Sequence, residues 1–225
     1  MISSEMIEKT FLQEYYQDSF QTFIDNEFSS KQSLKKSSEK KIQIGILHSG
    51  PFQPLTTFQH HVKKCNLHFL LIQEKEDYFP SILQEIEGEE CESHIQTITH
   101  NPFFLSEKCR DYDYFIIHHA SIYHKNLIEL CKELYKCLKD GGKIYIFHSV
   151  CNQSENKIWK KNFFREQIQY FTQIPIGKVK NVFDILDELN QISHLYKKIL
   201  CKPFQKKTYP IFGDHIIQLF SLQKI

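Results

Sequence analysis

Short apolar runs, separated by stretches of helical periodicity, extend along most of the chain. The runs consist mainly of isoleucine, leucine and phenylalanine, and they have the length of strands that are covered on both faces. Five of them predict parallel strands, at 42–47, 67–72, 95–99, 114–117 and 144–150. Two later segments alternate apolar and polar residues and predict an antiparallel pair, at 197–202 and 215–222, with 203–213 as the loop between them.

The segment from 111 to 150 has the pattern of a strand, a helix and a second strand. Apolar residues recur at helical spacing between the two strands, at Leu127, Leu130, Cys131, Leu134, Tyr135 and Leu138. The same spacing predicts a solvent-facing side made of Lys132, Glu133, Lys136 and Lys139. Gly141-Gly142 supplies the left-handed residue that we expect to end the helix. The unit is therefore a βαβ crossover, for which right-handedness is the rule.

Amphipathic helices are predicted on both sides of this central unit. The first has an aromatic face formed by Ile7, Phe11, Tyr15, Tyr16, Phe20, Phe23 and Ile24. Serines and lysines then dominate 29–41, which is typical of a polar linker. Two later helices are expected at 158–171 and 182–192. We therefore divide the chain into a helix and linker at 1–40 and one α/β domain at 41–225.

Composition argues against several classes of function. The chain of 225 residues has 28 Lys plus Arg against 27 Asp plus Glu, so no overall field recruits nucleic acid or an anionic membrane. Its seven cysteines form no C-x-x-C pair, which favours reduced thiols in an intracellular protein, cytoplasmic by default, with organelle import left open. No stretch of about 18 apolar residues is present, so no transmembrane segment is expected.

A strand that opens on an aspartate, a loop, and a helix that closes in Leu-Lys-Asp-Gly-Gly before the next strand occupy Asp113 to Phe147. This arrangement resembles the central half of the class I S-adenosylmethionine-dependent methyltransferases. The resemblance implies an α/β fold with a doubly wound, Rossmann-like, seven-stranded and mostly parallel sheet that ends in an antiparallel hairpin. Two shorter segments, at 16–20 and 154–161, are similar to histamine N-methyltransferase. They imply a substrate pocket formed by Tyr15, Tyr16, Phe20 and Trp159.

The family's cofactor loop follows the first strand, where an acidic residue precedes Gly-x-Gly-x-Gly. This chain aligns Ile46 with the acid, His48 with the first glycine and Phe52 with the third, which leaves Gly50 alone. A Cβ at the first glycine position fills space that the methionine moiety needs. If S-adenosylmethionine is held, the resemblance implies that it contacts His48, Ser49 and Gly50 in this loop, Gln73 or Glu74 at the ribose, and His119 with Ala120 after the fourth strand.

Two functions of different classes follow from this degenerate loop. In the first, the chain is a non-catalytic binding or scaffolding subunit of a larger assembly; it holds no cofactor and contacts other protein subunits. The alternative is an active S-adenosylmethionine-dependent N-methyltransferase that acts on a small amine. Methyl transfer depends mainly on positioning, so the sequence assigns no catalytic residue in either case.

Histidines follow several of the predicted strands. His48, His118, His148 and Cys151 could converge on one rim of a doubly wound sheet, and imidazoles with a thiol are credible zinc ligands. The chain has 12 histidines, however, and it lacks H-x-x-x-H and C-x-x-C spacing. We therefore predict no metal site and keep these four residues as a subordinate hypothesis.

Overall fold

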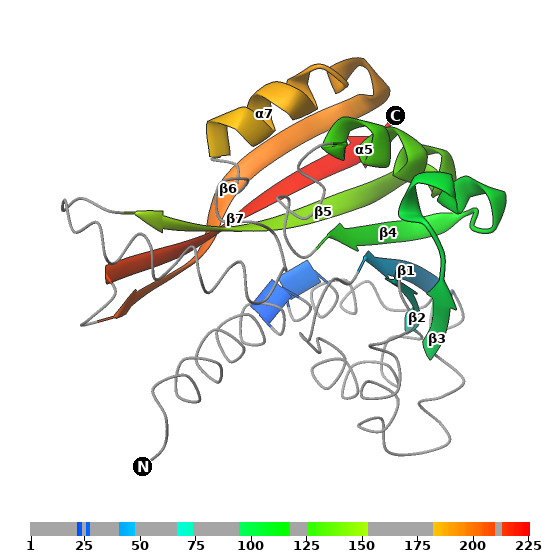
Figure 1. Ribbon diagram of the computed structural model, residues 1–225, viewed down its shortest axis with the longest axis horizontal. Coiled ribbons are helices and arrows are strands. Elements are labelled where there is room, and N and C mark those ends of the chain that lie inside the picture. Colours follow the sequence, from blue (N-terminus) through cyan, green and yellow to red (C-terminus); the bar gives the residue numbers. More distant parts are fainter. Residues whose placement is uncertain are drawn as a thin grey trace, which may run out of the picture.

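The structure of the protein is a computed structural model that describes residues 22–23, 26–27, 41–47, 67–73, 95–117, 126–152, 182–209 and 213–225 (Figure 1). A twisted sheet of seven strands runs through the molecule, and helices α5 and α7 lie over one of its faces. In this described part, no helix is long and apolar enough to cross a membrane.

Five neighbouring strands of the sheet are parallel, as the apolar runs predicted. They are β1 (Ile42–Leu47), β2 (Leu67–Gln73), β3 (Ile95–Thr99), β4 (Tyr112–Ile117) and β5 (Leu138–Asn152). The complete order across the sheet is β3-β2-β1-β4-β5-β7-β6. The chain therefore winds outward in both directions from β1 and β4, which makes that pair the topological switch point of a doubly wound fold.

The last two strands, β6 (Tyr196–Tyr209) and β7 (Gly213–Lys224), complete the sheet. β7 pairs antiparallel with both β5 and β6, which confirms the predicted mostly parallel sheet with an antiparallel end. The prediction of a loop over 203–213 was wrong, because β6 continues to Tyr209 and leaves only positions 210–212 between the strands. An edge strand tolerates Pro203, and the register shifts between Pro203 and Gln205, so a bulge absorbs the irregularity.

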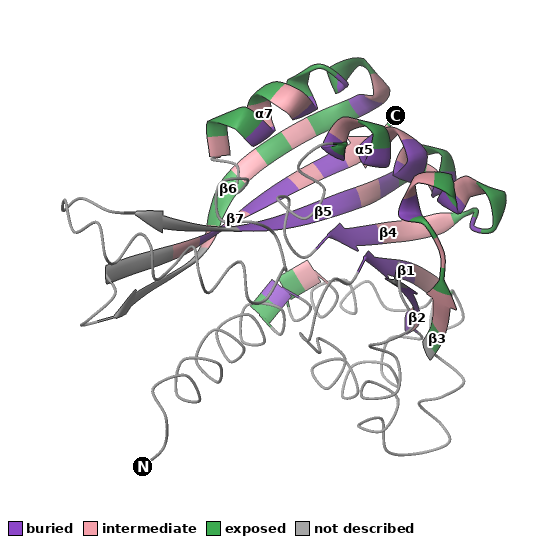
Figure 2. Ribbon diagram, in the orientation of Figure 1, coloured by how far each residue is buried: buried purple, intermediate pink, exposed green. Residues whose placement is uncertain are grey.

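Each face of the sheet has its own apolar core, seen as the purple strand segments of Figure 2. The face that we call the α5 face lies under α5 (Leu127–Cys137) and α7 (Val182–Asn190), and it buries Leu47, Ile72, Phe115, Ile117, Ile144, Ile146, Phe220 and Leu222. The other face, which we call the opposite face, buries Phe23, Ile44, Ile46, Leu67, Phe69, Leu71, Ile116, Tyr145, Phe147, Ile217 and Leu219. Alternate residues of each strand enter opposite cores, as strand geometry requires.

Helix α5 confirms the predicted apolar stripe but ends earlier than expected. Its last residue is Cys137, and the N–H of Leu138 closes the helix by donating to the carbonyls of Leu134 and Tyr135. Gly141 has the left-handed φ of 74° that the sequence predicted, but it lies in the register shift between β4 and β5 instead of ending the helix. A Cβ on Gly142 would lie 2.8 Å from the carbonyl oxygen of Lys139, so this shift needs glycine at both positions.

Glu133 was wrongly predicted to face solvent. It is only 5% exposed, because the short, kinked 3-10 helix η5 (Pro102–Glu107) packs against α5 at this position. Its Oε1 accepts hydrogen bonds from the backbone N–H and the hydroxyl of Ser106, and its Oε2 lies 2.7 Å from Nζ of Lys136. The side chains of Lys132 and Lys136 lie on the solvent-exposed side of α5, as predicted. A partner 27 positions earlier in the sequence therefore decides the burial of Glu133.

Candidate functional site

The carboxyl ends of β1, β2 and β4 lie close to one level at the switch point of the sheet, and β5 runs past them. The strand register pairs Leu47 of β1 with Ile72 of β2 and with Ile117 of β4, and it pairs Ile117 with Ile146 of β5. Leu47, Ile72, Ile117 and Ile146 therefore lie at one level of the sheet, which we call the rim. In open α/β sheets, ligands bind outside the carboxyl ends of the strands at this point, so the rim is the candidate ligand site.

Ile46 stands on β1 where the sequence comparison expected an acidic residue. Its side chain is fully buried in the core of the opposite face, beside its register partners Leu71 and Ile116. On the other side of β1, a Cβ added to Gly45 would lie 2.2 Å from the ring of Phe115, so the strand is packed closely on both faces. Position 46 near the end of β1 thus presents no carboxylate to the rim, because the isoleucine there packs into the apolar core.

His148 lies on β5, two positions beyond the level of the rim. It is fully buried, and it occupies the α5 face together with Ile144 and Ile146. The strand continues without a register shift to Cys151, which pairs with His215 of β7. A separation of three positions in an unbroken strand places the backbone of 148 and of 151 about 10 Å apart along the strand. The set of His48, His118, His148 and Cys151 stays a hypothesis, since the structure describes the side chain of only one of the four.

No group of three His, Cys, Asp or Glu residues suited to a metal ion occurs within the described ranges. Most of the residues that the sequence singled out lie outside those ranges, so their roles stay predictions: Tyr15, Tyr16, Phe20, His48, Ser49, Gly50, Glu74, His118, His119, Ala120 and Trp159. Gln73 ends β2 and pairs with Thr99 of β3, one position beyond Ile72, and its role at the ribose stays a prediction.

The N-terminal segment reaches the opposite face of the sheet through Phe23 and Glu27. The ring of Phe23 packs edge-on against Tyr145 and Phe147 of β5, with centroid distances of 4.7 and 5.2 Å. The hydroxyl of Tyr145 donates to Oε2 of Glu27 at 2.8 Å. Burial raises the pKa of Tyr145, and the neighbouring Glu27 carboxylate raises it further, so this hydroxyl stays a donor. These contacts fix Phe23 and Glu27 beside the strand that carries His148.

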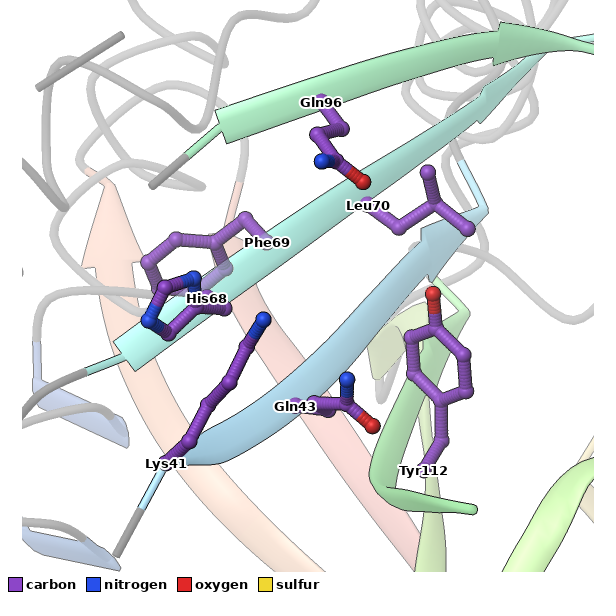
Figure 3. Close-up of a pocket in the computed structure, with 7 residues that line it drawn as sticks. All are labelled: Lys41, Gln43, His68, Phe69, Leu70, Gln96 and Tyr112. Carbon is purple, nitrogen blue, oxygen red and sulfur yellow. The ribbon is translucent and has the colours of Figure 1, made fainter. Parts of the chain in front are cut away.

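A small polar hollow lies at the opposite end of the sheet from the rim (Figure 3). Residues at the amino ends of β1 to β4 line it: Lys41, Gln43, His68, Phe69, Leu70, Gln96 and Tyr112. Its volume of about 20 Å³ suits a water molecule and is far too small for a nucleoside. The nearby carboxylate of Asp113 accepts from the backbone N–H of Gln43 and from Lys139, both at 2.9 Å. Asp113 therefore holds strands together at this end and is remote from the rim.

No protein-family model matches the sequence, and no curated protein matches it. Solved structures do match the fold. The CurJ carbon methyltransferase gives a TM-score of 0.62 at 11% identity, covering 91% of this chain and 54% of that one. A second match is phosphoethanolamine N-methyltransferase 2 of Haemonchus contortus, in complex with phosphomonomethylethanolamine and S-adenosylhomocysteine. Its TM-score is 0.56 at 12% sequence identity, and the match covers 88% of this chain and 52% of that one. The chain thus spans about half the length of these two proteins.

A third match covers nearly the whole of both chains. The plantazolicin methyltransferase BpumL, in complex with S-adenosylhomocysteine, gives a TM-score of 0.60 at 12% identity, covering 99% of this chain and 91% of that one. The [4+2]-cyclase SpnF gives a TM-score of 0.57 at 9% sequence identity, covering 89% of this chain and 80% of that one. The chain has the fold of the class I S-adenosylmethionine-dependent methyltransferases. Because a cyclase shares that fold, the fold alone does not identify the chemistry.

Proposed function

We propose that this methyltransferase-fold chain is a non-catalytic binding or scaffolding subunit of a larger assembly, with an eroded S-adenosylmethionine site. The observation that carries the proposal is the end of β1. The residue aligned with the cofactor's acidic partner is Ile46, which is buried in the apolar core of the opposite face. A carboxylate at that position would enter a core formed by Leu71 and Ile116, where an unpaired charge is strongly unfavourable.

The sequence beyond β1 supports the same conclusion. Of the three glycines that let the backbone approach a nucleotide, this chain keeps Gly50 and has His48 and Phe52 at the other two positions. The lost carboxylate removes a hydrogen bond to a charged amino group, which contributes about 1.5–3 kcal/mol, or roughly 10- to 150-fold in affinity. Steric exclusion by the two side chains adds to that loss.

An active S-adenosylmethionine-dependent N-methyltransferase acting on a small amine is the second candidate. The observation in its favour is the rim, where Leu47, Ile72 and Ile117 lie at one level of the sheet. This is the switch point, at which sheets of this class bind ligands. Such an enzyme would place the amine against Tyr15, Tyr16, Phe20 and Trp159. Its chemistry would need only in-line positioning in a dry pocket.

Titration calorimetry and thermal melts with S-adenosylmethionine and S-adenosylhomocysteine separate the two functions. A ligand at 100 times its dissociation constant stabilises a native protein by about 2.7 kcal/mol, which for this size is roughly 5–11 °C in midpoint. We expect no heat of binding and no shift at millimolar ligand, with BpumL as the positive control. A shift of this size would overturn the proposal. The variant His48→Gly, which restores the first glycine, would then be expected to bind still more tightly.

A further inference from the structure

Strand β6 forms one edge of the sheet, seen in orange beside α7 in Figure 1. It is 14 residues long and pairs with β7 on one side only. Its register is regular from Lys198 to Pro203, between shifts at Tyr196/Lys198 and Pro203/Gln205. The outer side of that regular stretch offers backbone N–H and C=O groups that no strand in the described part pairs with.

Positive charge collects along this edge strand. Five lysines lie between positions 197 and 207, and no aspartate or glutamate occurs between Glu188 and Asp214. The strand therefore carries +5 in a chain whose net charge is +1, which leaves −4 for all other residues together. The electric field of these lysines acts only locally, because salt in physiological buffer screens interactions between exposed charges that are more than about 8 Å apart.

Three lysines of β6 differ from the two lysines of α5 in forming no ion pair with a carboxylate among the described residues. Lys197, Lys198 and Lys202 are exposed, and within the described residues none of them forms an ion pair. The lysines of α5 and of the termini of β5 and β7 do form such pairs, namely Lys132–Glu129, Lys136–Glu133, Lys139–Asp113 and Lys224–Asp140. The charges of Lys197, Lys198 and Lys202 are thus not paired with a carboxylate in the described part of the protein.

The regular stretch of β6 also presents a specific alternation. Ile199 and Cys201 pack against the core of the α5 face. Lys198, Leu200 and Lys202 therefore share the other face of the strand, and Leu200 is 44% exposed. Figure 2 shows the corresponding alternation of exposed and intermediate residues along β6. Facing side chains on a paired strand interact across about 5 Å, so the complementary pattern is acidic, apolar, acidic.

We infer that the outer edge of β6 docks an extended acidic segment of a partner protein, which adds to the sheet as an eighth strand. Main-chain hydrogen bonds along Lys198–Pro203 supply affinity that does not depend on sequence. Lys198 and Lys202 select acidic partner residues, and Leu200 selects an apolar residue between them. This inference rests on the proposed binding function and names the chemistry of its partner.

The same residues disfavour other occupants of the edge. A second copy pairing antiparallel about Leu200 would set Lys198 against Lys202 twice, and like charges directly opposite each other are destabilising. A nucleic acid strand would meet lysines, but it would also meet the exposed Leu200, and the regular stretch has no aromatic side chain on which bases could stack. An acidic strand satisfies both the charge and the apolar position.

Fluorescence anisotropy of the full chain with a labelled ten-residue peptide of alternating glutamate and valine tests the inference. The double variant Lys198→Glu with Lys202→Glu is expected to raise the dissociation constant about tenfold or more. The matched control, Lys108→Glu with Lys132→Glu, changes the same charge away from β6 and is expected to stay within about twofold. Melting curves verify that each variant is folded. If charge reversal unfolds the protein, Lys198→Gln with Lys202→Gln replaces it, with a smaller loss expected.

Two further probes separate strand addition from simple charge attraction. The same peptide with an N-methyl group on every residue keeps its charge but has no backbone N–H donor on either edge, so it is expected to bind much more weakly. Equal binding of the methylated peptide, equal effects of the two double variants, or tighter binding of a ten-residue oligouridylate would each overturn the inference. Calorimetry with S-adenosylmethionine on the same preparation tests the proposed function separately, since no peptide takes part in that measurement.

Discussion

Glu133 is a buried carboxylate on α5, and its replacement by alanine tests whether it fastens η5 to the sheet. Its Oε1 accepts the backbone N–H of Ser106 at 2.8 Å and the Ser106 hydroxyl. A hydrogen bond to a charged group contributes about 1.5–3 kcal/mol, and the two bonds share one acceptor atom. The exposed ammonium of Lys136 is screened by water and adds little. We expect Glu133→Ala to lower the free energy of unfolding by about 2–3 kcal/mol.

For a protein of this size, that loss corresponds to a midpoint about 4–12 °C lower in a thermal melt followed by circular dichroism. The matched control is Glu129→Ala on the same helix. Glu129 makes the same i,i+3 pair with a lysine, but its side chain is 63% exposed, so its loss is expected to stay within about 0.5 kcal/mol. A double-mutant cycle with Ser106→Ala should give a coupling of at least about 1 kcal/mol. Equal losses in the two glutamate variants, or no coupling, would refute the reasoning.

The pH dependence supplies an independent check on Glu133. Burial raises the pKa of this carboxyl, but hydrogen bonds from Lys136 and Ser106 outweigh burial and leave the pKa below its usual value of 4.5. A carboxyl with a lowered pKa in the folded state stabilises the protein above the unfolded-state pKa and loses that contribution as pH falls through the folded-state pKa. The stability difference between wild type and Glu133→Gln should therefore be constant from pH 7 to about 5 and shrink below about 4.5.

Three shorter predictions concern the packing of the sheet. Gly45→Ala places a Cβ 2.2 Å from the ring of Phe115 and should lower the free energy of unfolding in urea by about 1–3 kcal/mol. Adding Phe115→Leu should restore part of that loss, whereas an unchanged urea midpoint for Gly45→Ala would contradict the close packing. Tyr196→Phe removes a buried 2.7 Å hydrogen bond from the tyrosine hydroxyl to the carbonyl of Cys131, so it should lower the free energy of unfolding by about 1–1.5 kcal/mol. An unchanged free energy of unfolding would instead indicate that water hydrates this hydroxyl. Burial raises the pKa of Cys131 and of Cys137 to about 12, so both thiols should resist alkylation by iodoacetamide at pH 8 until urea unfolds the protein. Peptide mass spectrometry measures the labelling, and rapid labelling of the native protein would argue against the burial of these thiols.

Local periodicity was sufficient to predict most of the sheet. The runs at 42–47 and 95–99 match β1 and β3 at both ends, and the spacing at 127–138 and 182–192 predicted α5 and α7. Such patterns succeed because a strand buried on both faces must be apolar throughout, whereas a covering helix must be apolar on one side. The departure from the family's Gly-x-Gly-x-Gly pattern at His48 and Phe52 needed no structure, since it is a statement about residue types; its effect on cofactor binding stays a proposal.

The sequence alone determined the fold class, because the order of apolar strands and amphipathic helices admits few ways to cover both faces of a sheet. Only the tertiary structure decided which polar residues are buried and where the edge strand ends. Glu133 is buried because Ser106 lies against it, and β6 passes Pro203 because β7 lies beside it and a bulge absorbs the proline. Periodicity reports the nearest turn of chain, whereas these outcomes depend on partners from distant parts of the sequence.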